Sequence, residues 1–322
     1  MYHKVLIPLD GSPFSEEALP LAVGAAKRTG AELRLVHVVE PLFGQFTITA
    51  EEVAERQLKL LAAQITADTG VPANAEVLKG KAQTELLDYI ERHEIDLVVV
   101  ATHGWGGLQR AWLGSTTDAL VREAAIPVLA LRPSGRHTPA TPAAAVKAGL
   151  GESTGEVLRA AQGTAPGAEL LAGTIARRPL ITLDGSELAE SAIDPVVDLV
   201  GPDAEYTLLR VVQIPILPDP MTGAWAADLW QEQLPAIEAD AKAYLDDVAA
   251  RIAGRVRAVR TAIRTELSAA AAILDYAAQN RIDLIGIATR GHGGLRRLAL
   301  GSVADKVLRG AEVPVLVKGS GD

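Results

Sequence analysis

The chain contains two copies of one sequence pattern, and this duplication limits the folds that it can adopt. The segment Ile7–Ser12 recurs as Ile181–Ser186, 174 positions later. The segment Leu87–Leu131 aligns without gaps to Leu274–Lys318, 187 positions later, and 22 of the 45 aligned positions are identical. Internal repeats of roughly 135 to 145 residues have the size of a whole domain rather than of a solenoid unit. We therefore expect two similar domains.

Composition excludes several classes of protein and site. The length of 322 residues suits two domains on a prior of about 150 residues each, and 48% hydrophobic residues suffice for a core in each. A net charge of −9 argues against nucleic acid as a partner, because Lys and Arg must neutralise its phosphates. Without cysteine there is no disulfide, thiolate nucleophile or cysteine-ligated metal. No signal peptide or membrane-spanning stretch is recognisable, so a cytoplasmic protein is expected.

A segment between the copies differs from both in composition. Ser134–Ala176 is rich in Ala, Gly, Thr and Pro and has few large apolar residues, which is typical of a linker. Leu158, Leu170 and Leu171 are the residues in it that could tether it to a domain surface. The expected organisation is a first domain at residues 1–133, a linker at 134–176 and a second domain at 177–320.

Short β-like runs alternate with amphipathic helical patterns in each copy. This alternation predicts an α/β fold with doubly wound parallel sheets and helices on both faces. The predicted strands of the first copy are Val5–Leu9, Leu33–Val39, Glu76–Leu78, Leu97–Val100 and Pro127–Leu131. Those of the second are Leu180–Leu183, Tyr206–Val212, Ala262–Arg264, Leu284–Ile287 and Pro314–Val317. The second copy also holds an insertion that leads into a long helical pattern, Ala226–Ala253.

Two loops at strand ends in each copy have the composition of an anion site. In the first copy these are Leu9–Ser12, after the first strand, and Ala101–Gly104, which is followed by nine residues and then Gly114-Ser115. The second copy repeats the latter pattern from Ala288 to Ser302. Ligands of open α/β sheets lie at the carboxyl ends of the strands, and glycines before a helix N-terminus expose backbone N–H groups to a phosphate.

A purely structural interpretation of these loops stays open. Ser115-x-x-Asp118 and Ser302-x-x-Asp305 match a capping box, so the serines could serve only as helix caps. Asp10 and Asp184 could be N-caps or turn residues at the start of the first helix of each copy. His103 could simply bond to backbone, and Arg110, Arg296 and Arg297 could be solvated helix-face charges.

Other kinds of site find no support in the sequence. None of the six histidines forms a short-spaced pair, which argues against a preformed zinc site. The sequence Gly-x4-Gly-Lys-Ser/Thr of P-loop proteins is absent. No nucleophile and base are paired by spacing, so no catalytic residue is predicted and no metal ligand is assigned.

Both copies resemble the universal stress protein domain, over Met1–Pro133 and about Arg177–Lys318. The resemblance rests on Val5–Ser12, on the Gly-x9-Gly-Ser stretches and on the closing strands that begin at Pro127 and Pro314. It implies five-stranded parallel sheets in the order 3-2-1-4-5. The nucleotide-binding subclass of that family carries Gly-x2-Gly-x9-Gly-Ser/Thr, so the resemblance also implies a site for ATP, ADP or AMP, with Mg²⁺ held through the phosphates.

The site residues are carried over position by position from that resemblance. Asp10 and Asp184 match the aspartate beside adenosine, and Val38 and Val211 match the position whose backbone reads the adenine edge. The remaining positions are Pro8, Leu9, Ala101, Thr102, Gly104, Gly107, Gly114, Ser115 and Thr116 in the first copy, and Thr182, Leu183, Ala288, Thr289, Gly291, Gly294, Gly301, Ser302 and Val303 in the second.

This chain departs from the family pattern at three places. Ala101 and Ala288 stand where the first motif glycine is expected, which is acceptable only where φ is negative. Trp105 and His292 replace a basic residue that commonly follows the second glycine. Thr182 occupies the position of Pro8.

Three functions are compatible with this sequence. The first is a stress-response regulatory protein that binds ATP without efficient turnover. The second is a slow Mg²⁺-dependent ATPase or phosphotransferase, and the third is an interaction module without nucleotide. By resemblance, the two domains should associate through their last strands as a pseudo-dimer within one chain, and pairing of two chains as a homodimer stays open. Neither nucleic acid nor a membrane is expected as a partner.

Overall fold

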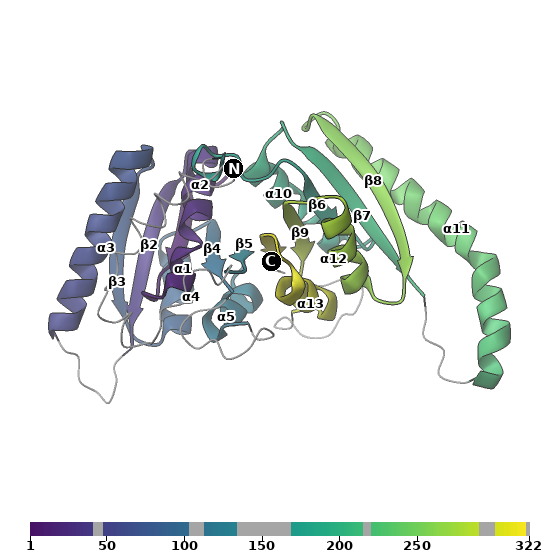
Figure 1. Ribbon diagram of the computed structural model, residues 1–322, viewed down its shortest axis with the longest axis horizontal. Coiled ribbons are helices and arrows are strands. Elements are labelled where there is room, and N and C mark those ends of the chain that lie inside the picture. The colour runs from purple at the N-terminus through teal and green to yellow at the C-terminus, as the bar shows by residue number, and fades with distance from the viewer. Residues whose placement is uncertain (41–47, 103–112, 134–168, 215–219, 290–299, 320–322) are drawn as a thin grey trace.

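The computed structural model describes residues 1–40, 48–102, 113–133, 169–214, 220–289 and 300–319 (Figure 1). The elements of the first copy are β1 (Lys4–Pro8), α1 (Pro13–Glu16), α2 (Leu19–Thr29), β2 (Glu32–Val39), α3 (Ile48–Thr69), β3 (Ala73–Lys79), α4 (Ala82–Arg92), β4 (Leu97–Ala101), α5 (Ser115–Glu123) and β5 (Val128–Leu131). Those of the second are β6 (Pro179–Thr182), α9 (Glu187–Glu190), α10 (Ile193–Val200), β7 (Glu205–Gln213), α11 (Pro220–Ile252), β8 (Ala258–Glu266), α12 (Ala269–Gln279), β9 (Leu284–Ala288), α13 (Ser302–Gly310) and β10 (Val315–Lys318).

All these strands belong to one ten-stranded sheet, in the order β3-β2-β1-β4-β5-β10-β9-β6-β7-β8. Within each copy the strands are parallel, and the predicted α/β fold and the order 3-2-1-4-5 are confirmed. The last strands of the two copies, β5 and β10, pair antiparallel, with Leu129 opposite Leu316. The two half-sheets are therefore continuous through this pair (Figure 1).

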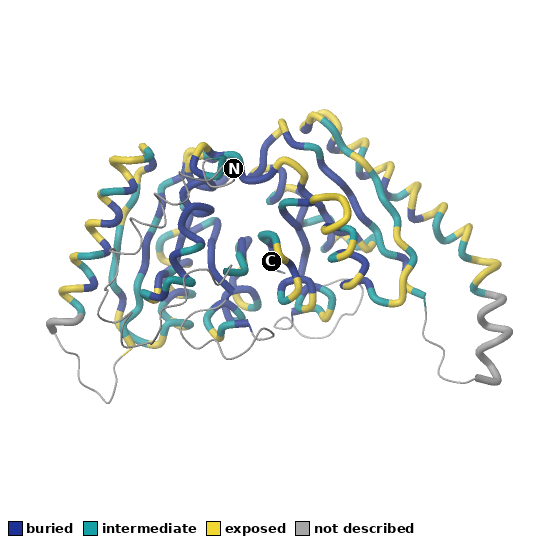
Figure 2. The backbone as a smooth tube through the Cα atoms, in the orientation of Figure 1, coloured by how far each residue is buried: buried dark blue, intermediate teal, exposed yellow. Residues whose placement is uncertain are grey.

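Two apolar layers cover the two faces of the sheet. Alternate residues of each strand enter opposite layers, as the pleat requires: Val5 and Ile7 lie in one cluster and Leu6 in the other. Helices α2, α3, α10 and α11 contribute buried residues to the first cluster, and α4, α5, α12 and α13 to the second. The central strands are buried along their length, while α3 and α11 expose their outer faces (Figure 2). Each layer thus extends across both copies.

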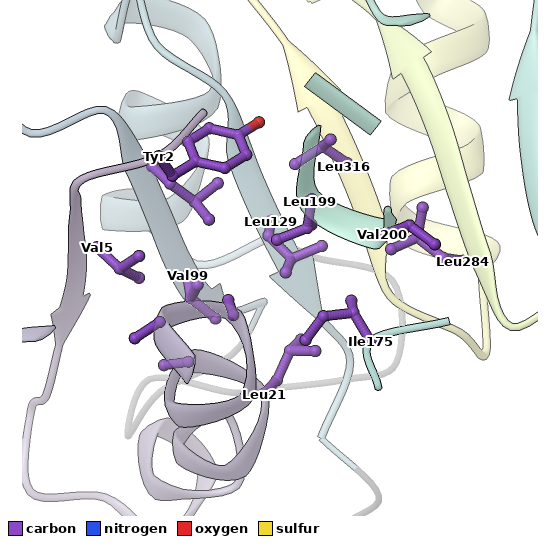
Figure 3. Packing of buried hydrophobic residues seen from close by; sticks show 14 of the residues in the cluster. Tyr2, Val5, Leu21, Val99, Leu129, Ile175, Leu199, Val200, Leu284 and Leu316 are labelled. Carbon is purple, nitrogen blue, oxygen red and sulfur yellow. The ribbon is translucent and has the colours of Figure 1, made fainter. Parts of the chain in front are cut away.

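The copies also touch beside the sheet, where α2 meets α10. The hydroxyl of Tyr2 donates to the backbone oxygen of Pro195 at 3.0 Å, and Arg28 Nε donates to that of Val200 at 3.2 Å. Figure 3 shows side chains of both copies in this cluster, with Ile175 next to Leu21 of α2. The β5–β10 pair is therefore supported by a second, apolar contact on one face of the sheet.

The C-terminal end of the predicted linker belongs to that contact. Leu171, Ile175 and Ala176 are buried in the first cluster, and residues 169–171 form a helical turn. Of the residues that could tether the linker to a domain, Leu171 is buried and Leu170 packs against this cluster. Burial of a few apolar side chains thus fixes a short segment whose composition is that of a linker. Residues 134–168 lie outside the described part of the chain.

The two edge strands and the first helix of the first copy differ from the sequence-based expectation. The edge strands β3 and β8 are longer than the predicted Glu76–Leu78 and Ala262–Arg264. The first helix of the first copy is divided into α1 and α2, with Pro20 in the first turn of α2, where a missing N–H costs nothing.

The long insertion helix is α11, and among the described residues no helix is apolar enough over a sufficient length to cross a membrane.

Candidate functional site

The predicted site loops meet where the order of the strands reverses. In the first copy the chain runs from β1 outward to β2 and β3 and then returns to β4 on the other side of β1. The loops that follow β1 and β4 therefore leave the sheet at neighbouring carboxyl ends and in opposite directions. The same holds for β6 and β9 in the second copy. Ligands of open α/β sheets lie at such points.

The loop after the first strand is a tight turn held by its aspartate. Asp10 Oδ1 accepts from the backbone N–H of Ser12 at 2.8 Å, and Asp184 Oδ1 accepts from that of Ser186 at 2.9 Å. Gly11 and Gly185 have φ of 77° and 93°, a region that favours glycine. Asp10 and Asp184 are exposed turn residues, whereas Ser12 and Ser186 are the N-caps of α1 and α9. Asp10 and Asp184 are therefore turn residues, and their interpretation as N-caps is wrong.

Val38 and Val211 lie just beyond the end of the neighbouring first strand. The last register pairs are Pro8 with Val36 and Thr182 with Leu209. Leu9 N donates to Val36 O at 2.8 Å and Leu183 N to Leu209 O at 2.9 Å. Because backbone groups of a parallel strand point to alternate sides, the residues two positions later point to the same side. The backbone N–H and C=O groups of Val38 and Val211 therefore point to the side on which β1 and β6 lie, but beyond the last residues of those strands.

The ends of β4 and β9 are buried and extended. Ala101 and Ala288 are the last residues of these strands and neither has a positive φ, so a methyl group in place of the first motif glycine causes no backbone strain. The carbonyl of Thr102 accepts from Gly114 N at 2.8 Å, and that of Thr289 accepts from Gly301 N at 2.5 Å. These bonds bring the two ends of each glycine-rich loop together.

The glycine-rich loops themselves lie outside the described residues. This concerns Gly104, Gly107, Gly291 and Gly294, and also His103, Trp105, Arg110, His292, Arg296 and Arg297. The described chain thus stops one residue after each strand, at Thr102 and Thr289, and resumes at Leu113 and Leu300.

The N-cap residue of helices α5 and α13 is a glycine, which has no side chain to cap them. Gly114 and Gly301 are the N-cap residues, with φ of −58° and −61°. Ser115 and Ser302 are the first helical residues and are exposed, and Thr116 and Val303 follow them. Asp118 and Asp305 form ion pairs with Arg122 (2.8 Å) and Arg309 (2.9 Å) four residues later. The capping-box interpretation is therefore wrong, and in the described part of the chain the first-turn N–H groups of both helices donate to no side-chain cap.

This geometry predicts that the motif serines contribute little to stability. We expect Ser115→Ala and Ser302→Ala to change the free energy of unfolding by less than about 0.5 kcal/mol, as at ordinary surface positions. Ser12→Ala and Ser186→Ala are the matched controls, because their Oγ atoms accept from Ser15 N and Ala189 N at 3.1 Å. These should each cost about 1 kcal/mol. Urea denaturation measures all four, and equal losses at the two kinds of serine would contradict the assignment of the caps.

Two polar residues at this edge did not emerge from the sequence analysis. His37 directly precedes Val38, and its Nδ1 donates to the backbone oxygen of Leu9 at 2.7 Å. Arg210 directly precedes Val211 and lies over the ring of Tyr244, 5.1 Å from Cζ to the centroid. Both residues could have been found from the sequence by one signal, a polar residue that interrupts an apolar strand close to its carboxyl end.

The electrostatics around Asp184 are set by groups from several elements. Burial raises the pKa of Tyr244 above its ordinary value, and the neighbouring Glu190 carboxylate raises it further. The phenol therefore keeps its proton at neutral pH. Within the described ranges no three His, Cys, Asp or Glu side chains gather to hold a metal ion.

Comparisons with known proteins agree on one family. The model of the universal stress protein family matches residues 1–132 and 176–318. A universal stress protein of Methanocaldococcus jannaschii is 31% identical over 141 residues, which are 41% of this chain and 83% of that protein. The crystal structure of a universal stress protein from Archaeoglobus fulgidus covers 98% of both chains with a TM-score of 0.61 and 20% identity. Another was solved in complex with cAMP; it is 20% identical, with 41% of this chain and 99% of that one aligned and a TM-score of 0.35.

Proposed function

The chain belongs to the universal stress protein family, and from this premise we propose that it is a regulatory protein that binds ATP in both copies without efficient turnover. The observation that carries the proposal is the glycine at the start of α5 and α13. Their φ values of −58° and −61° are open to any residue, so backbone conformation does not explain a glycine in both copies. Close approach of a ligand to an uncapped helix N-terminus would account for it.

Each part of the site would take one part of the nucleotide. The first-turn N–H groups after Gly114 and Gly301 would bind phosphate oxygens, together with the glycine-rich loops. Asp10 and Asp184 would accept from the ribose hydroxyl groups, since their Oδ2 atoms accept no hydrogen bond from a described residue. The backbone of Val38 and Val211 would pair with the edge of the adenine. ADP and AMP share these groups, and Mg²⁺ would be held through the phosphates.

We further propose that the two copies act as an intrachain pair of domains, at residues 1–133 and 177–320. The pairing of β5 with β10 and the contact between α2 and α10 support this arrangement. Because both outer edges of the sheet belong to β3 and β8, a homodimer would have to use another surface than the last strands. A cytoplasmic location remains part of the proposal.

Binding is tested most directly on protein as it is purified. We expect denaturation of the fresh protein to release an adenine nucleotide, identified by mass spectrometry. We also expect Mg-ATP to raise the melting temperature, because a ligand present at 100 times its Kd stabilises the native state by about 2.7 kcal/mol per site. Mg-GTP at the same concentration is the control for base recognition. No released nucleotide and an unchanged melting temperature would overturn the proposal.

A further inference from the structure

Arg210 is a half-buried cation at the carboxyl edge of the second copy. It follows the last register pair between β6 and β7, Thr182 with Leu209, and so lies just past the end of β6. Its guanidinium is packed against the turn that holds Asp184: a Cβ built on Gly185 would be 3.3 Å from Nη2 and 3.4 Å from Cζ. The ring of Tyr244 on α11 supports it, with Cζ 5.1 Å from the ring centroid. Turn and ring together fix its position.

The nearby carboxylates form no ion pair with Arg210 among the described residues, although Oδ2 of Asp184 has no described hydrogen-bond partner. Glu190 is paired with Arg251 at 2.8 Å. Asp184 Oδ1 accepts from Ser186 N at 2.9 Å and from Ser186 Oγ at 2.6 Å. Among the described residues the side chain of Arg210 forms neither an ion pair nor a hydrogen bond. A guanidinium carries five N–H donors, and here they are held in place without an acceptor from the described part of the protein.

The order of the strands places Arg210 at one end of the candidate site. Helix α13 follows β9, the turn of Asp184 follows β6, and Arg210 stands on β7, with β6 between β9 and β7. Neighbouring strands are about 4.8 Å apart, so β9 and β7 are about 10 Å apart. A ligand with one phosphate at the N-terminus of α13 that crosses the end of β6 therefore presents its far end to Arg210.

The first copy has a different residue at this position. His37 follows the corresponding last pair, Pro8 with Val36, and its Nδ1 donates to the backbone oxygen of Leu9 at 2.7 Å. One of its two nitrogens is thus used within the turn. The two copies consequently differ in charge and in free donors at otherwise corresponding places.

We propose that Arg210 is a specificity-determining residue, which binds an anionic group at the nucleoside end of the ligand. The second copy would then select nucleotides that carry a phosphate on the ribose in addition to the 5′ phosphate, whereas the first copy would not. Bidentate binding of phosphate suits the planar guanidinium. This inference rests on the proposed function, because it assigns the second phosphate-binding group of the same site.

The test compares AMP with adenosine 3′,5′-bisphosphate and adenosine 2′,5′-bisphosphate by titration calorimetry. The full-length chain carries Gly114→Val, which confines nucleotide to the second copy. We expect one of the bisphosphates to bind about ten-fold more tightly than AMP, which corresponds to about 1.4 kcal/mol. Arg210→Gln should remove this preference, and Arg210→Lys should retain part of it. Arg210→His, with the residue that the first copy has, should also remove it, and thermal unfolding checks that each variant is folded.

The reciprocal exchange tests the same residue in the first copy. In a chain with Gly301→Val, His37→Arg should create a preference for the bisphosphate that the unaltered first copy lacks. Equal binding of AMP and both bisphosphates in the second copy, or a preference that survives Arg210→Gln, would overturn the inference while ATP binding stands. If the unaltered protein binds no nucleotide, both the inference and the proposed function fail.

Discussion

The double variant Gly114→Val/Gly301→Val is expected to bind ATP about 100-fold more weakly than the unaltered protein while staying folded. A branched side chain at these positions keeps a phosphate away from the first-turn N–H groups. Two lost hydrogen bonds to a charged group, each worth about 1.5 to 3 kcal/mol, account for a loss of this size. The measurement is titration calorimetry with Mg-ATP, with circular dichroism to follow the fold.

The fold is expected to survive because valine can adopt the conformation of both glycines. The φ and ψ values of −58° and 143° at Gly114, and of −61° and 147° at Gly301, lie in the extended region open to all residues. Exchange of a glycine N-cap for an aliphatic residue costs at most about 1 kcal/mol per helix. Gly254→Val is the matched control, since a Cβ there meets nothing within 4 Å. If the folded double variant binds ATP normally, the phosphates lie elsewhere and the interaction module without nucleotide becomes the better hypothesis.

The central strands could be predicted from sequence because a strand that is buried on both faces needs apolar residues at every position. Leu97–Ala101 and Leu284–Ala288 are apolar and buried at every position, as parallel strands covered by helices require. The edge strand β8 has charged or threonine side chains at five of its nine positions, Ala258–Glu266, and no residue of it is fully buried. Its pairing with β7 depends on backbone bonds that residue types do not encode, and so only its middle was predicted.

The start of α5 shows why a motif can be found and still be misassigned. Ser115 and Asp118 satisfy the capping-box spacing, but Asp118 also has Arg122 four residues later, and the ion pair is what forms. Both possible roles of Asp118, in a capping box with Ser115 and in an ion pair with Arg122, could be read from the sequence. Which of them forms depends on the residue at which the helix begins. A boundary shifted by one residue moves the cap from Ser115 to Gly114. Arg210 was missed for a similar reason, because its environment comes from Tyr244 of a distant helix.

The second prediction with a large expected effect concerns the contact between α2 and residues 169–176, at the place where the two copies meet. We expect Gly24→Ala to lower the free energy of unfolding by about 2 kcal/mol, within the range for overpacking of a core. Helix propensity alone favours alanine over glycine by about 1 kcal/mol, so the sign of the effect identifies the contact. A Cβ on Gly24 would lie 3.2 Å from Ile175 Cδ1 and closer still to the backbone oxygen of Leu170. That oxygen accepts from Gly173 N at 2.8 Å, so it cannot move without opening the turn at 169–173.

Urea denaturation of Gly24→Ala against Gly254→Ala separates this contact from a general effect of alanine. Gly254 has open space around its Cα, and its variant should be neutral or slightly stabilised. Ile175→Ala should cost about 2 to 4 kcal/mol as a buried truncation. Because both changes act on the same segment, the double variant Gly24→Ala/Ile175→Ala should lose less than the sum of the single losses. A stabilised Gly24→Ala variant, or additive losses in the double variant, would show that residues 169–176 do not pack against α2 in solution, and the pairing of β5 with β10 would then have to hold the two copies together without them.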